Sequence, residues 1–234
     1  MSMPFYVAPE QMMKDRADFA RKGISRGRAL AALSIQDGVL LCAENHSRTL
    51  RKISEIYDRV AFAGVGRYNE FDQLRIAGVR HADLKGYTYS REDVDARSLA
   101  NQYAQLLGQT FTHELKPMEV EILIAEVATN SAEDQMFHVL YDGTINDESG
   151  FTVLGGAANS VAEKLDQTYE QDWQLSDALK AAAEALSHHE KDAHENSMAV
   201  SGVADLEVAL LARNHTGRAF QRIEGDELAT YLRG

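Results

Sequence analysis

The sequence predicts an α+β fold in which two sheets lie face to face and pairs of helices cover their outer sides. Strand patterns and helix patterns come in separate runs along the chain, which is typical of α+β proteins rather than of parallel βαβ units. Each helical pattern also has one apolar face, which needs a sheet to cover it. The composition agrees, because a chain of 234 residues with 44% hydrophobic residues can form a core without metals or disulfides.

The N-terminal half is expected to contain one helix, four strands and two further helices. Pro9 suits the first turn of a helix, and Gly23 suits its end. Asp37-Gly38 is a hairpin turn signal between two apolar segments. The four expected strands cover residues 30–35, 39–43, 53–57 and 60–65. Helical spacing then predicts two buried faces, one with Phe71, Leu74 and Gly78, the other with Ala100, Ala104, Leu107 and Phe111.

The C-terminal half is expected to repeat this alternation. Strands are expected over residues 118–124, 137–141 and 151–154, with a turn at Asp142-Gly143. Two helical faces follow, one with Val161, Leu165 and Tyr169, the other with Leu175, Leu179, Ala182 and Leu186. Ser176 is the candidate N-cap of the second helix. The polar segment 188–204 is expected to be a loop, followed by strands 206–211 and 219–223 and a closing helix over 226–232.

Charge and cysteine content argue against several classes of function. With 24 basic and 36 acidic residues the net charge is −12, so the surface should repel nucleic acid and anionic lipid. The sequence has no run of 18 apolar residues that could span a membrane, and its N-terminus lacks the basic start and apolar core of a signal peptide. The single cysteine, Cys42, rules out an internal disulfide and fits a reducing compartment. We therefore expect a cytoplasmic protein that binds neither nucleic acid nor membrane.

Motifs for self-contained catalysis or cofactor binding are weak. The glycines at 64–66 and 155–156 complete no phosphate-binding loop, which argues against nucleotide binding. His189 and His194 are five residues apart, whereas a helical zinc-binding pair needs a spacing of four, so a solvated loop is favoured over a metal site. Cys42 lies in an apolar strand, which suits a buried, unreactive thiol. These patterns favour a binding or assembly protein that needs no cofactor.

Longer stretches of the chain resemble the proteasome subunit family. The two hairpin regions, 26–39 and 52–66, match the family's opening strands, and the second has the lysine-isoleucine pattern and the strand that ends in glycine. The segment Pro9-Glu10-Gln11-Met12-Met13 is similar to the extra leading helix of α-type subunits, in its actinobacterial 20S form. Further matches lie at 68–72, 99–104 and 121–127.

This resemblance covers nearly the whole chain and implies a particular architecture. The family fold is a four-layer αββα sandwich, that of the N-terminal nucleophile hydrolases. Residues 1–234 would form a single α-type domain, with residues 1–8 as a gate segment, 9–23 as the leading helix and 24–234 as the core.

The resemblance also implies that this chain has no catalytic residue of its own. Proteasome β subunits expose an N-terminal threonine, whose hydroxyl attacks the peptide carbonyl while its free amine acts as the base. Arg28 stands at that position, directly after Gly27, and a guanidinium cannot serve as the nucleophile. Glu44 and Lys52 correspond to an acid and a lysine near the β active site, but here they have no hydroxyl to activate. The chain would then be a component of the threonine endopeptidase complex rather than its enzyme.

A different role for Lys52 follows from the resemblance to α subunits. In α rings, a lysine at this position lies in a pocket between neighbouring subunits and binds the C-terminal carboxylate of an activator's tail. Gly27 matches the pocket glycine, and Gly66 and Arg67 correspond to the opposite wall, although Arg67 replaces the usual apolar residue. The alternative is a surface lysine with a solvated ammonium group.

Assembly and gating are the remaining implied roles. Met1, Ser2, Met3, Pro4, Phe5, Tyr6, Val7 and Ala8 would help to close the axial pore of an α ring, and the alternative is a frayed chain end. The leading helix would pack on the next subunit. A heterologous interface of this kind builds a ring when it closes. The family expectation is a ring of seven subunits. The implied partners are a β-subunit ring and a hexameric AAA ATPase that delivers intracellular proteins tagged with Pup, a ubiquitin-like modifier.

Two other functions remain open at this point. A β-type threonine peptidase that awaits processing would be cleaved near residue 28 and would begin with a hydroxyl. A self-assembling ring of the same fold would have no protease partner.

Overall fold

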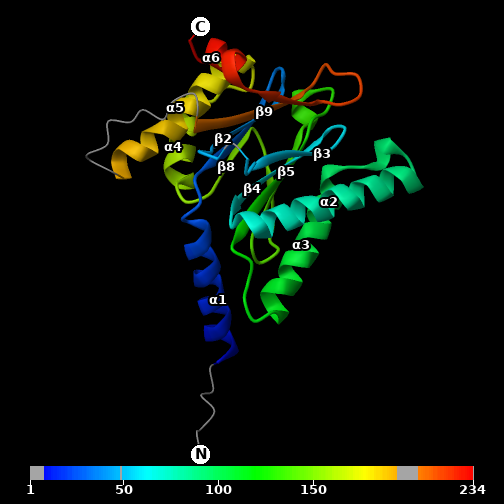
Figure 1. Cartoon of the computed structure of the whole chain (residues 1–234), viewed down its shortest axis with the longest axis vertical. Coiled ribbons are helices and arrows are strands. Elements are labelled where there is room, and N and C mark those ends of the chain that lie inside the picture. Colours follow the sequence, from blue (N-terminus) through cyan, green and yellow to red (C-terminus); the bar gives the residue numbers. More distant parts are fainter. Residues whose placement is uncertain (1–7, 48, 194–204, 234) are drawn as a thin grey trace, which may run out of the picture.

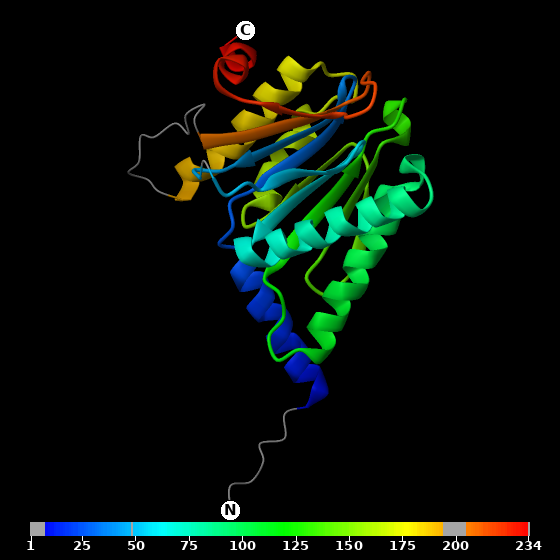
Figure 2. The ribbon, with the colours of Figure 1, turned by 45° about the vertical axis from the view of Figure 1, so that its right-hand side comes forward.

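The computed structural model describes residues 8–47, 49–193 and 205–233. In these ranges the chain forms two five-stranded antiparallel sheets that pack face to face, with helices on both outer sides (Figure 1, Figure 2). The expected four-layer αββα sandwich with an additional N-terminal helix is confirmed.

The first sheet has the strand order β10-β9-β2-β1-β8. These strands are β1 (Leu30–Ile35), β2 (Gly38–Glu44), β8 (Phe151–Leu154), β9 (Leu206–Ala212) and β10 (Phe220–Ile223). Its outer face packs against α4 (Ala158–Thr168), α5 (Leu175–Ala193) and α6 (Gly225–Arg233). Strands β1 and β2 are buried along their whole length, which explains why their sequences are almost continuously apolar.

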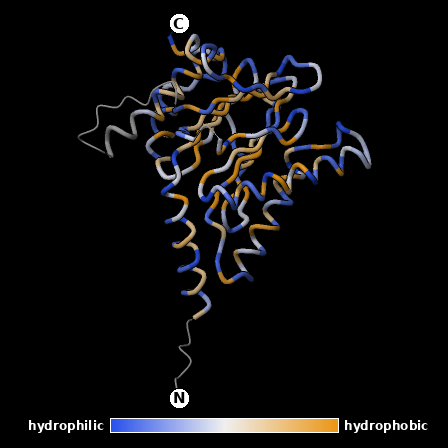
Figure 3. Tube along the Cα trace, in the orientation of Figure 1, coloured by the Kyte–Doolittle hydropathy of each residue, from blue (hydrophilic) through white to orange (hydrophobic). Residues whose placement is uncertain are grey.

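The second sheet has the strand order β3-β4-β5-β6-β7. These strands are β3 (Ile53–Tyr57), β4 (Val60–Gly66), β5 (Val120–Glu126), β6 (Gln135–Val139) and β7 (Ile145–Glu148). Helices α2 (Tyr68–Thr88) and α3 (Ala96–His113) cover its outer face, and Phe62 lies in the core beneath them. Ala61 and Ala63, which alternate with Phe62, point to the opposite side and pack between the sheets. The apolar residues are accordingly concentrated along the strands (Figure 3).

Helix α1 (Pro9–Ile24) extends away from the sheets, while α6 lies at the opposite end of the long axis (Figure 1). The C-terminal part of α1 is attached to the sandwich, because Ala20 and Ile24 are buried in a small cluster with Tyr141. The Arg16 guanidinium donates to the carbonyl oxygen of Thr110 at 3.2 Å and also contacts that of Glu114. It thereby caps the C-terminal end of α3.

A buried ion pair joins distant parts of the sandwich. The Arg213 guanidinium donates to both carboxylate oxygens of Asp134, at 2.7 and 2.8 Å, and to the carbonyl oxygen of Ile35 at 2.9 Å. The Ser34 hydroxyl donates to the same carboxylate at 2.6 Å. Strand β1 is thus tied to the loop that precedes β6 and to the end of β9.

Four local expectations need correction. Gly38 is the first residue of β2, so the hairpin turn consists of Gln36 and Asp37. Helix α5 begins at Leu175, and the Asp37 carboxylate accepts the Leu175 N–H at 2.9 Å, so Ser176 is inside the first turn and is not the N-cap. The helix also continues through residues 188–193, which were expected to be a loop, because lysine, glutamate and alanine favour helix. Strand β7 was not predicted, since it is a largely polar strand at the edge of its sheet.

Candidate functional site

Lys52 lies at the end of the loop between β2 and β3, immediately before Ile53. Its ammonium group donates to the backbone carbonyl oxygen of Arg28 at 2.9 Å, which brings it to the start of β1. Burial lowers the pKa of Lys52 to about 8; the Glu207 carboxylate opposes this shift and the Arg28 guanidinium adds to it. The side chain is therefore a partly buried ammonium beside the segment that contains Gly27 and Arg28.

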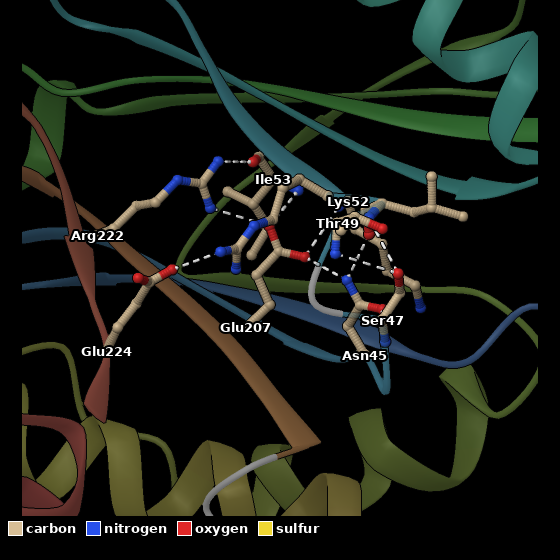
Figure 4. A network of polar contacts seen from close by, with 10 residues as sticks. Asn45, Ser47, Thr49, Lys52, Ile53, Glu207, Arg222 and Glu224 are labelled. Atoms are coloured by element: carbon tan, nitrogen blue, oxygen red, sulfur yellow. Dashed lines mark hydrogen bonds and ion pairs between the residues drawn. The ribbon is translucent and has the colours of Figure 1, made fainter. Parts of the chain in front are cut away.

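The buried carboxylate of Glu207 in β9 holds the loop that presents Lys52 (Figure 4). It accepts the backbone N–H groups of Lys52 and Ile53 at 2.9 and 3.1 Å and the Asn45 side-chain amide at 2.7 Å. Arg222 neutralises its charge at 3.0 Å and donates to the Ile53 carbonyl oxygen at 2.6 Å. The Glu207 side chain is only 2% exposed, so these contacts are screened little by solvent.

Gly27 and Gly66 form a closely packed wall next to Arg28, whose carbonyl oxygen accepts the Lys52 ammonium. A Cβ atom at Gly27 would lie 2.6 Å from Cγ1 of Val65 and 3.1 Å from the backbone nitrogen of Gly66, so only glycine lets these segments approach. Gly66 has φ +112°, a conformation that favours glycine, and an added Cβ would overlap the carbonyl oxygen of Glu119. The structure therefore brings the Lys52 ammonium to the carbonyl of Arg28, the residue after Gly27, and packs Gly66 against Gly27.

The side chain of Arg67 is engaged in a neighbouring cluster. Its guanidinium lies 3.8 Å from the Glu70 carboxylate and 3.6 Å from that of Glu119, and it is 52% exposed. Lys116 contacts the same two carboxylates at 2.8 and 3.1 Å. Arg67 thus follows Gly66 in the chain, while its guanidinium faces the carboxylates of Glu70 and Glu119.

The position where a threonine nucleophile would stand holds an ion pair. The guanidinium of Arg28 donates to the carboxylate of Glu44, and the Glu44 side chain is almost fully buried. His46 lies 3.6 Å from the same carboxylate. Since Arg28 also follows a folded helix and a turn, it is not the first residue of the intact chain.

Comparisons with known proteins identify the family of this chain. The proteasome subunit family model matches residues 24–203. The chain belongs to the proteasome subunit family. It is 57% identical to a protein named proteasome subunit alpha from Acidimicrobium ferrooxidans, over 99% of this chain and 97% of that protein.

Other relatives give the same result for this proteasome-family chain. It is 51% identical to a proteasome subunit alpha from Thermobifida fusca, over 99% of this chain and 91% of the relative. It is 52% identical to one from Kineococcus radiotolerans, over all of this chain and 99% of the relative. The likeness therefore includes helix α1 as well as the sandwich.

Other candidate groups contribute little to the site. Residues 1–7 of the expected gate segment and His194 lie outside the described residues, and Ala8 is an exposed residue before α1. Burial raises the pKa of the Cys42 thiol to about 12, with Glu207 adding to the shift, so this thiol is protonated and unreactive. A search of the described residues found no cluster of three side chains suited to hold a metal ion. Over the same residues, no helix has the length and apolar character needed to cross a membrane.

Sequence reasoning missed Glu207 and Glu119. Glu207 is the one charged residue in the otherwise apolar run 206–212, which was a usable signal that its carboxylate is buried and paired. Glu119 directly precedes an apolar strand, and nothing in the local pattern indicates its contacts with Gly23 and Gly66.

Proposed function

We propose that this chain is a non-catalytic α subunit of a bacterial 20S proteasome. It forms the outer ring of the particle, docks a hexameric AAA ATPase and controls the entry of Pup-tagged proteins in the cytoplasm. The observation that carries the proposal is the Lys52 ammonium at the carbonyl of Arg28, next to the packed glycines Gly27 and Gly66, in a chain that has Arg28 in place of a nucleophile.

The lack of catalysis is argued from the chemistry at residue 28. Catalysis by an N-terminal threonine requires a hydroxyl and a free α-amine on the same residue. Arg28 has no hydroxyl, its guanidinium is paired with Glu44, and its backbone nitrogen is in a peptide bond to Gly27. Proteolysis is then an activity of the whole particle, supplied by the β ring.

The N–H donors of the Lys52 ammonium support the docking role. An ammonium has three N–H donors, and the Arg28 carbonyl accepts one of them. A tail carboxylate that enters beside Gly27 can accept another. One such contact is weak, but several tails on one ring gain affinity because each later docking is intramolecular.

Helix α1 supports the proposed ring and the proposed gate. Met12 and Phe19 are 44% and 49% exposed on a helix that projects from the sandwich, which supports packing on a neighbouring subunit. Residues 1–8 precede this helix, and we propose that they meet at the ring axis. We propose a ring of seven subunits, the number that the family resemblance implies.

The test uses particles assembled with the β subunit. Lys52→Ala should abolish ATPase-stimulated degradation of a folded, tagged protein and leave hydrolysis of a small peptide unchanged. Lys180→Ala, on α5, is the matched control and should behave as wild type. Equal stimulation of the Lys52→Ala and wild-type particles would refute the docking proposal.

Two measurements separate the alternatives. The intact mass of the chain from the assembled particle should correspond to an uncleaved polypeptide, whereas a chain that starts at residue 28 would identify a processed peptidase. Co-expression with the β subunit should yield a mixed particle, and its failure to form would favour a ring without a protease partner.

A further inference from the structure

Helix α1 and the wall formed by Gly27 and Gly66 meet at Glu119, the residue before β5. The side chain of Glu119 crosses α1 at Gly23, where the helix has no side chain of its own. A Cβ atom at Gly23 would lie only 2.6 Å from Cγ of Glu119 and 2.7 Å from its Cβ. The last turn of α1 therefore rests directly on Glu119.

The backbone of Glu119 holds the wall formed by Gly27 and Gly66. The Glu119 carbonyl oxygen accepts the N–H of Arg67 at 3.0 Å. That oxygen also occupies the space where a Cβ atom of Gly66 would be, so Gly66 is in close contact with it. Since Gly66 lies against Gly27, a displacement of this wall must also displace Glu119.

Charge contacts restrict the Glu119 side chain, which is only 12% exposed. Its carboxylate lies 3.1 Å from the Lys116 ammonium and 3.6 Å from the Arg67 guanidinium. Its backbone N–H donates to the Glu70 carboxylate at 2.7 Å. Arg67 is the loosest member of this cluster, because its distances exceed those of hydrogen bonds and half of its side chain is in solvent.

We propose that Glu119 is a positioning residue that transmits occupancy of the Lys52 pocket to helix α1. This inference rests on the proposed function of the pocket as the site for an activator's tail. A tail that docks beside Gly27 and Gly66 bears on the wall, and its negative charge competes with Glu119 for Arg67. Either effect moves the Glu119 side chain across Gly23 and changes how α1 is seated.

The test separates tail binding from the response of α1. The probe is the C-terminal heptapeptide of the AAA ATPase used in the degradation assay above, as the free acid, with its C-terminal amide as the control. Binding to the assembled particle is measured by fluorescence anisotropy, and the response is the change in hydrogen exchange of residues 9–24 when the peptide is added.

Gly23→Ala is the first variant, because it adds one methyl group where Glu119 lies and leaves the pocket residues intact. We expect its affinity for the free acid to stay within about twofold of wild type, and its exchange response to fall about fivefold or more. Gly108→Ala is the matched control, since it also adds a methyl group within a helix, where the nearest atom is the Asp142 carbonyl oxygen at an ordinary 3.4 Å. It should keep the full response.

Glu119→Ala is the second variant. It should lose the exchange response of residues 9–24 because it removes the side chain that contacts α1, whereas Gly23→Ala crowds that side chain. In the double variant Gly23→Ala/Glu119→Ala the added methyl group has no side chain to meet, so basal exchange of residues 9–24 should match that of Glu119→Ala alone. A full response in both single variants would overturn the coupling, and so would a loss of affinity as large as the loss of response. If wild type binds the free acid no better than the amide, the pocket function itself is wrong and the coupling falls with it.

Discussion

The Glu207 carboxylate accepts the backbone N–H of Lys52 at 2.9 Å, although 155 residues separate the two in the sequence. The same carboxylate accepts the N–H of Ile53, so both backbone groups at the start of β3 are fixed from β9. The direction of the Lys52 side chain is therefore set by the other sheet of the sandwich.

Glu207→Gln should weaken docking at Lys52 without touching the ammonium group. An amide accepts hydrogen bonds less strongly than a carboxylate and leaves Arg222 without its charge partner, so we expect a loss of about 1.5–3 kcal/mol in unfolding free energy. ATPase stimulation of the particle should fall while small-peptide hydrolysis persists. Glu224→Gln is the control, because Glu224 pairs with Arg51 at the surface and should contribute little. Full stimulation in a destabilised Glu207→Gln particle would contradict the positioning role.

Tail binding should depend on pH through Lys52. Only the ammonium form attracts a carboxylate, and the pKa of Lys52 is lowered to about 8. Affinity should therefore be constant below that value and fall as the pH rises through it, by about tenfold between pH 7 and pH 9. Lys52→Arg keeps its charge over this range and should give a flat profile. A wild-type affinity that holds until above pH 10 would show that Lys52 titrates as an ordinary lysine.

Deletion of residues 2–8 should accelerate hydrolysis of small or unfolded peptides by the assembled particle. These residues precede the first turn of α1, so the variant keeps that helix and the whole sequence of the sandwich. The rate is compared with that of the full-length particle at equal β-subunit content. An unchanged rate would mean that these residues do not restrict entry.

Removal of one partner of the Asp134–Arg213 pair should strongly destabilise the subunit. The two side chains are 2% and 7% exposed, so Asp134→Ala leaves a buried, uncompensated guanidinium. We expect a loss of about 3–5 kcal/mol in the free energy of unfolding by urea. Arg218→Ala, at an exposed ion pair with Glu55, is the control and should cost about 1 kcal/mol or less. Similar losses in the two variants would argue against the buried pair as a structural tie.

The sequence predicts the order of elements well where burial produces a clear period. Strands β1 and β2 were recognisable from their apolar runs, and α2 and α3 from the spacing of Phe71, Leu74 and Leu107. Strand β7 has polar residues and one free edge, so it has no such period. The extension of α5 depends on helix propensity in polar residues, which a hydrophobic pattern cannot detect.

For the candidate site, the resemblance to a known family indicated Lys52, Gly27, Gly66 and Arg67; the structure places the Lys52 ammonium at Arg28, next to Gly27, and Gly66 against Gly27. The residues that hold them could not be found in this way. Glu207 and Glu119 act through contacts between segments far apart in the sequence, and only the three-dimensional arrangement reveals these contacts.

The ion pair between Arg28 and Glu44 would oppose a change to peptidase chemistry at residue 28. Arg28→Thr alone would supply a hydroxyl but would leave the Glu44 carboxylate buried without its guanidinium, a costly arrangement. The hydroxyl would also lack a free amine until the 27 preceding residues were removed. Peptidase chemistry at residue 28 would thus need several coordinated changes, with less stable intermediates between them, and the proposed architectural role would be hard to reverse.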